Sequence, residues 1–157
     1  VAPGATDAQV VLQYARAVTD GVFACPAARM AGAQSAVAPV YAYQFDDPDA
    51  VAPESMRHLP FPIGAGHALD LRYLFDIAGG SAPDAAQRAL SAQMIRYWAA
   101  FVTNATPNAE GAPDPDWPQL ADAAGAGPVM SLQPDGSRPI STFTGDHRCA
   151  FWAGLAS

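Results

Sequence analysis

The feature that most constrains the fold of this chain is its shortage of β-strand. Only residues 39–45 alternate clearly, with aromatic side chains at every second position, which predicts a strand. Residues 129–132 and 140–143, separated by a Pro-Asp-Gly turn, predict a weaker hairpin. Three short strands cannot pair their own edges and also cover several helices. We therefore expect the chain to complete a larger sheet that another polypeptide, or further sequence, supplies.

Two helices are expected before the strand. Thr6 and Gln9 form a capping box, and apolar residues then recur at helical spacing, which predicts a helix over residues 7–19. After Asp20 and Gly21 a second helix is expected to end near residue 34, with Pro26 in its first turn.

A third helix follows the strand after a long irregular segment. Residues 46–66 are rich in proline and acids, and loops of this length are often functional. Asp84 and Gln87 form a second capping box, which begins an amphipathic helix that stops before Pro107. Residues 106–117 are rich in proline, glycine and acids, and we expect them to form an exposed loop.

Composition excludes several classes of function. The chain has 157 residues, half of them hydrophobic, which suits one domain. It contains no lysine, and eight arginines stand against fifteen acids, so we expect no nucleic-acid partner. No run approaches the roughly 20 apolar residues of a membrane helix, and no signal peptide is visible, so the sequence reads as soluble. Abundant alanine, with arginine in place of lysine, suggests a bacterial source with a GC-rich genome.

The chain has three histidines, and their settings differ. His67 lies in the long loop after the best strand, where α/β folds place reactive groups, and glycines precede it. His58 and His147 lack such a setting, and we interpret them as surface residues. The two cysteines, Cys25 and Cys149, are far apart, so zinc is not expected. On composition alone they are as compatible with two free core thiols as with a disulfide.

Five segments, in order, resemble the type-B carboxylesterases, the cholinesterase-like branch of the α/β-hydrolases. Residues 64–75, GAGHALDLRYLF, are similar to the histidine motif of that family. The other matches are the segment TDGVFACP at 19–26, VYAYQF at 40–45, YWAAF at 97–101 with the later PN and WP pairs, and HRCAFW at 147–152. The resemblance covers most of the chain from about residue 20 to residue 152.

The resemblance implies hydrolysis of carboxylic esters by a serine-histidine-acid triad in which His67 is the general base. The serine of the family lies in a Gly-x-Ser-x-Gly elbow, and this sequence contains no such spacing. The acid and the oxyanion hole are also expected outside the chain. We interpret Asp70 as structural, paired with Arg72 or capping the next turn. The expected partners are an N-terminal portion of the same esterase, which carries the missing groups, and a small ester substrate. No cofactor and no membrane partner are expected.

The expected fold class is α/β, with residues 1–157 forming the C-terminal portion of one α/β-hydrolase catalytic domain. The resemblance pairs Cys25 with Cys149, which implies an oxidising, extracytoplasmic or secreted location. Two other readings stay open. One is a cholinesterase-like binding or adhesion module that has lost the triad, and the other is an independent small binding domain.

Overall fold

A computed structural model describes residues 3–122 and 125–155 of the chain. The chain divides into two compact units that interleave in sequence. The first unit comprises Val1–Ala42, Gln119–Val129 and Ile140–Ser157, and the second comprises Tyr43–Pro118 and Met130–Pro139. Each unit is described by itself below. No helix of the described residues is long and apolar enough to cross a membrane.

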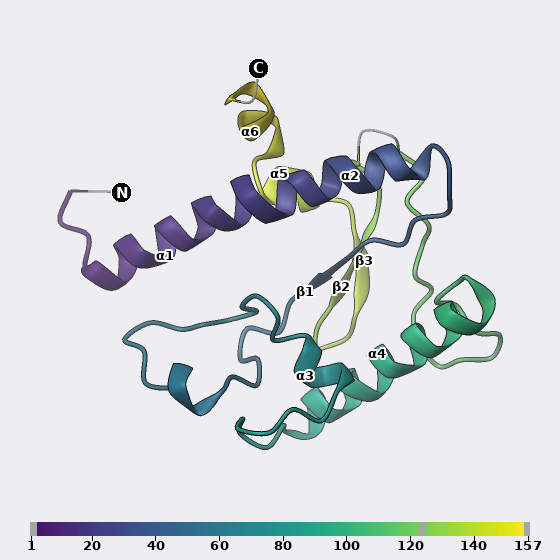
Figure 1. Cartoon of the computed structure of the whole chain (residues 1–157), viewed down its shortest axis with the longest axis horizontal. Coiled ribbons are helices and arrows are strands. Elements are labelled where there is room, and N and C mark those ends of the chain that lie inside the picture. Colours follow the sequence, from purple (N-terminus) through teal and green to yellow (C-terminus); the bar gives the residue numbers. More distant parts are fainter. Residues whose placement is uncertain (1–2, 123–124, 156–157) are drawn as a thin grey trace. The chain divides into compact units, whose positions relative to one another are not determined.

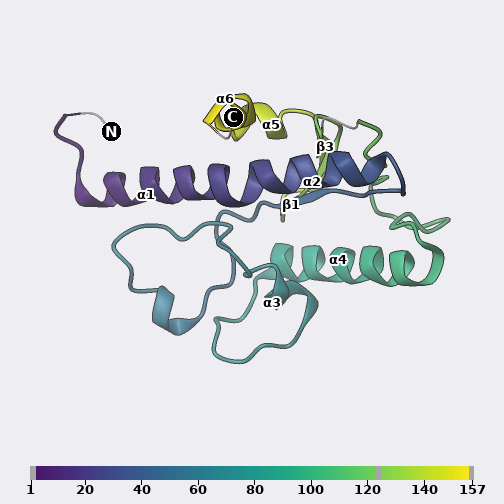
Figure 2. The same cartoon turned by 45° about the horizontal axis from the view of Figure 1, so that its top comes forward.

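The first unit is built on one continuous helical rod (Figures 1 and 2). It consists of α1 (Asp7–Val18), the π-helical turn η1 (Thr19–Ala24) and α2 (Cys25–Ser35). The Thr6 side chain accepts a hydrogen bond from the Gln9 backbone, so the expected capping box begins α1. The expected break at Asp20 and Gly21 is wrong, because η1 absorbs these residues within the rod.

Two short C-terminal helices, α5 (Phe143–Asp146) and α6 (Cys149–Leu155), complete the first unit. Helix α6 packs against η1, and the Trp152 ring lies against Gly21. A Cβ atom at Gly21 would lie 2.8 Å from the Trp152 ring, so a glycine is needed there for the tail to pack. This close approach explains a glycine inside a helix, where glycine ordinarily costs stability.

Apart from the end residues Val129 and Ile140, the second unit contains a three-stranded sheet in the order β1-β2-β3 (Figure 1). Strand β1 (Tyr43–Phe45) runs parallel to β2 (Val129–Leu132), with Tyr43 opposite Met130. The expected strand over residues 39–45 is therefore too long, because residue 40 instead accepts a backbone hydrogen bond from Leu120. Strand β3 (Arg138–Ile140) is displaced from the expected 140–143, because Phe143 already begins α5.

Helix α4 (Ala85–Asn104) contributes several side chains to the core of the second unit. Asp84 and Gln87 cap it reciprocally, as the sequence predicts, and Ala105 ends it in the left-handed region with φ of 57°. The short helices η2 (Glu54–Met56) and α3 (Leu71–Leu74) lie in the preceding segment, and α3 packs against α4. The buried side chains on α4 are Gln87, Leu90, Met94, Tyr97 and Ala100.

The segment after α4 is the expected loop, and most of it is exposed or half-buried, but Pro107 and Trp117 are buried. Trp117 is only 4% exposed, and its ring packs edge-on against Tyr97 and Tyr43. The amide of Asn108 holds the Trp117 backbone through two hydrogen bonds of 2.8 and 2.9 Å. The loop is therefore pinned to the core at its far end by one buried aromatic ring.

Candidate active site

His67 lies on the surface of the second unit, in a turn that directly precedes α3. Gly64 and Ala68, on either side of it, adopt left-handed backbone angles with φ of 60° and 64°. Such an angle is unusual for alanine and is a local strain that the surrounding packing must support. The imidazole of His67 is exposed.

Backbone hydrogen bonds make the turn regular from Gly66 to Tyr73. The amides of Leu69, Leu71, Arg72 and Tyr73 each donate to the carbonyl oxygen three residues earlier, at 3.0 to 3.3 Å. The series has the repeat of a tight 3₁₀-type turn. Gly66 and Ala68, the two neighbours of His67, therefore both accept bonds of this series.

The apolar residues that follow His67 are buried only in part. Leu69 and Tyr73 are buried, with 5% and 2% of their surface exposed. Leu71 and Phe75 are exposed over 42% and 62% of their surface. The segment is helical at α3 and not extended, so its alternate residues do not all lie on one face.

Asp70 ties the histidine turn to β1. The Tyr43 hydroxyl donates a 3.0 Å hydrogen bond to Asp70 Oδ2. Burial, then the charge of Asp70 and this hydrogen bond, raise the pKa of Tyr43 to about 12. The expected pairing with Arg72 is wrong, because the Arg72 guanidinium donates to the carbonyl oxygens of Ile77 and Ala78.

A buried carboxylate, Asp47, anchors the other end of the turn. Its Oδ2 accepts from the Tyr73 hydroxyl and, at 2.9 Å, from the Gln87 amide. Its Oδ1 accepts from the backbone amide of Asp49 at 2.9 Å. Burial and the bond to Asp47 raise the pKa of the Tyr73 hydroxyl, which keeps that donor protonated. Sequence reasoning missed Asp47, whose only local signal is its place in a pair of acids directly after the strand.

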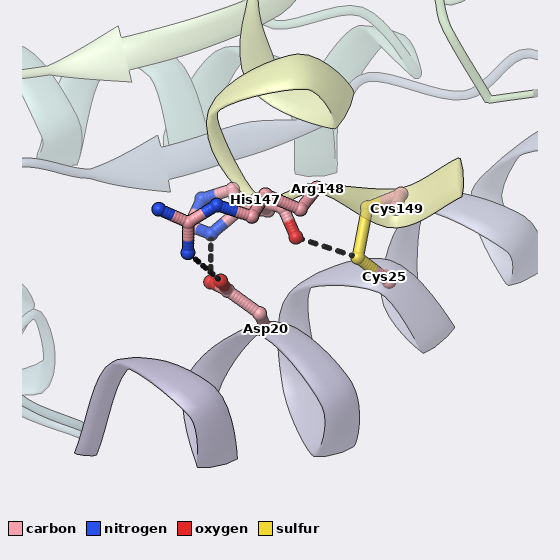
Figure 3. The surroundings of a disulfide bond; sticks show 5 residues. All are labelled: Asp20, Cys25, His147, Arg148 and Cys149. Carbon is pink, nitrogen blue, oxygen red and sulfur yellow. Dashed lines mark hydrogen bonds and ion pairs between the residues drawn. A yellow bond between two sulfur atoms is a disulfide. The ribbon is translucent and has the colours of Figure 1, made fainter. Parts of the chain in front are cut away.

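The other two histidines take different places. His58 is exposed and lies 3.4 Å from Glu54. His147 is not the surface residue that the sequence suggested, because its ring is largely buried in the first unit and its Nδ1 lies 2.7 Å from Asp20 Oδ1 (Figure 3). Arg148 Nη1 lies 4.0 Å from the other Asp20 oxygen. Asp20 and His147 are 127 positions apart, so no local pattern links them.

The disulfide lies beside this pair. The structure joins Cys25 to Cys149 across 124 positions, which attaches α6 to the start of α2 (Figure 3). Cys25 Sγ also lies 3.4 Å from the carbonyl oxygen of His147. Both cysteines lie in the first unit, and His67 lies in the second.

A metal site does not emerge from the described residues, in which no three His, Cys, Asp or Glu side chains gather suitably. One ion pair of the second unit joins Arg96 to Asp114 through two bonds of 2.6 and 2.7 Å. The hydrogen bond from Arg96 is the main cause of a lowered pKa for Asp114. This pair fixes the loop after α4 and has no evident catalytic part.

Comparison with known proteins places these features in a family context. Residues 2–152 match the model described as the Carboxylesterase family. Human cocaine esterase is 32% identical over 144 residues, which are 89% of this chain and 24% of the human protein. Rat acylcarnitine hydrolase is 34% identical over 113 residues, which are 69% of this chain and 19% of the rat protein.

Solved structures agree in fold. The carboxylesterase of Geobacillus stearothermophilus matches with a TM-score of 0.65 and 25% sequence identity, over 96% of this chain and 29% of that one. Both comparisons show that the chain spans about a quarter of the length of the relatives it matches.

Proposed function

The chain belongs to the carboxylesterase family and has the fold of part of an α/β-hydrolase, and from this premise we propose that it supplies the catalytic histidine of a serine esterase. The reaction is hydrolysis of a carboxylic ester. The observation that carries the proposal is His67 itself, which is exposed on a hydrogen-bonded turn directly before α3. The segment that contains it also resembles the histidine motif of the family.

His67 acts as a proton carrier in two half-reactions. In the first, its neutral imidazole takes the serine hydroxyl proton while the serine oxygen attacks the ester carbonyl carbon. The imidazolium then protonates the leaving alkoxide, and an acyl-enzyme remains. In the second half-reaction His67 takes a proton from water, the hydroxide attacks the acyl carbon, and the serine oxygen leaves with that proton. The chemistry needs no cofactor.

The serine, the acid and the oxyanion hole come from an N-terminal portion of the same esterase. Two observations support this part of the proposal. The sequence contains no Gly-x-Ser-x-Gly elbow, and the chain matches about a quarter of the length of its relatives. Residues 1–157 then form the C-terminal portion of one catalytic domain.

The disulfide supports an extracytoplasmic or secreted location for the protein. Disulfides persist where the compartment is oxidising, and cytosolic thiols are kept reduced. The bridge between Cys25 and Cys149 closes a long loop, which is the arrangement that benefits most from a covalent link.

Kinetics of histidine variants test the proposal. The intact protein that contains this chain is assayed with a p-nitrophenyl ester, as wild type, His67→Ala and His58→Ala. We expect His67→Ala to lower kcat by about a hundredfold to ten-thousandfold, which is the usual contribution of a general base. His58 is the matched control, because its ring is also exposed and its loss removes the same chemical group. Equal activity of the three proteins would exclude a catalytic role for His67, and a wild type without activity would favour a binding module.

A further inference from the structure

Short backbone hydrogen bonds link the His67 turn to the segment that ends at a buried side chain. Gly66 and Ala68, the two neighbours of His67, accept from Leu69 and Leu71, and Asp70 accepts from Tyr73. Tyr73 lies six residues after His67, and its ring packs 4.9 Å from the Phe45 ring at the end of β1. The Ser91 hydroxyl of α4 donates a 2.6 Å hydrogen bond to the Tyr73 carbonyl oxygen. Tyr73 therefore contacts both β1 and α4.

The hydroxyl of Tyr73 is held by a carboxylate that is almost completely buried. Asp47 is 1% exposed, and its three donors are the Tyr73 hydroxyl, the Gln87 amide and the Asp49 backbone, all of which are neutral. A carboxylate buried among neutral donors adds little net stability, since the cost of desolvation offsets much of the attraction. It does fix the orientation of the groups that donate to it, because each of its oxygens accepts from donors in set positions.

Catalysis requires such fixed geometry. A general base transfers a proton only within hydrogen-bond reach of its partner, and a displacement of about 1 Å at the reacting groups costs about a hundredfold in rate. We propose that Tyr73, held by Asp47, is a positioning residue for His67 in the esterase reaction. This inference rests on the proposed function, and it assigns to a buried tyrosine a role that its burial alone does not imply.

A pair of tyrosine variants separates positioning from simple stabilisation. Tyr73→Phe removes only the hydroxyl that reaches Asp47. Tyr97→Phe is the matched control, because Tyr97 is also 2% exposed and its hydroxyl donates a 2.6 Å bond to the Pro115 carbonyl oxygen, in the same unit and away from the turn. In the intact protein at a temperature where both variants are folded, we expect Tyr73→Phe to lower kcat by about tenfold with KM unchanged. Tyr97→Phe should keep kcat within about twofold.

Hydrogen exchange gives a readout that does not depend on activity. The amides of residues 69–73 should exchange faster in Tyr73→Phe and at the wild-type rate in Tyr97→Phe, since only the first change loosens these backbone hydrogen bonds. If Tyr73→Phe does not fold, Ser91→Ala provides a milder change on the same anchor, and we expect the same direction of effect in kcat and in exchange.

The outcomes are distinguishable from failure of the proposed function. If His67→Ala is inactive but Tyr73→Phe and Tyr97→Phe behave alike in kcat and in exchange, the positioning role is overturned and the esterase function stands. If His67→Ala retains wild-type activity, the proposed function fails, and with it the premise of the positioning role.

Discussion

Tyr43 on β1 and Asp70 in the histidine turn are joined by a hydrogen bond of 3.0 Å between the phenol and the carboxylate. The two residues are 27 positions apart, and the bond fastens the segment that carries His67 to the sheet. The Tyr43 ring also packs edge-on against Trp98 and Trp117. One tyrosine therefore connects the turn, the sheet and the long helix of the second unit.

Removal of the Tyr43 hydroxyl should weaken this connection. We expect Tyr43→Phe to lower the free energy of unfolding by about 1 kcal/mol, because a hydrogen bond to a charged acceptor is lost at a half-exposed site. Urea denaturation of the intact protein measures the change. Tyr14→Phe is the control, since Tyr14 is 72% exposed and its substitution should leave the urea midpoint unchanged. An equal effect of the two substitutions would contradict a specific role for the Tyr43 hydroxyl.

The disulfide should be the largest single contribution to stability in the first unit. Closing a loop of 124 positions reduces the entropy of the unfolded chain, which predicts a loss of about 3–5 kcal/mol in the double variant Cys25→Ser and Cys149→Ser. Thermal unfolding with and without a reducing agent measures it. Reductant should lower the melting temperature of the wild type and leave that of the double variant unchanged. If reductant leaves the melting temperature of the wild type unchanged, the bridge does not form in solution.

The buried pair of Asp20 and His147 should matter more than the exposed pair of Glu54 and His58. We expect Asp20→Asn to cost about 1–3 kcal/mol, because it leaves a largely buried ring without its charged partner. Glu54→Gln should cost less than about 0.5 kcal/mol, since exposed ion pairs contribute little. Chemical denaturation measures the loss of stability in both variants. A larger loss in Glu54→Gln than in Asp20→Asn would contradict a stabilising role of the buried pair.

The ion pair of Arg96 and Asp114 should make stability sensitive to acid. The pKa of Asp114 is lower in the folded state than in the unfolded state, so its stabilisation is present above the unfolded value of about 4 and is lost as the pH falls through the folded value. Asp114→Asn should therefore destabilise the protein at pH 7 by about 1 kcal/mol and make little difference at pH 2. Asp116→Asn in the same exposed loop is the control, and denaturation curves across this pH range measure both. A pH-independent effect of Asp114→Asn would rule out the electrostatic explanation.

The sequence predicted the starts of α1 and α4 well because their signals are local. The capping boxes at Thr6 and Asp84 each depend on a residue three positions away, and both are present in the structure. The strands were placed less well. Strand β1 is limited to three residues by its pairing with β2, which lies more than 80 positions later, and no local pattern reports that limit.

The buried polar pairs were beyond sequence reasoning for the same reason. Asp47 meets Tyr73 across 26 positions, and Asp20 meets His147 across 127, so neither pair leaves a periodic signal. The interpretation of His147 as a surface residue failed because the disulfide beside it draws the C-terminal segment onto η1. The family resemblance, by contrast, was predictable, because it depends on the order of several motifs and not on any one contact.

Chemical rescue of His67→Ala by imidazole tests the central claim most directly. The intact protein with this substitution is assayed against a p-nitrophenyl ester with increasing free imidazole, and His67→Ala without imidazole gives the baseline. If His67 carries the proton, ester hydrolysis should fall by about a hundredfold or more and should rise again with imidazole in a saturable manner. The background reaction of imidazole with the ester, measured without protein, is subtracted. Wild-type activity in His67→Ala before any imidazole is added would contradict the account.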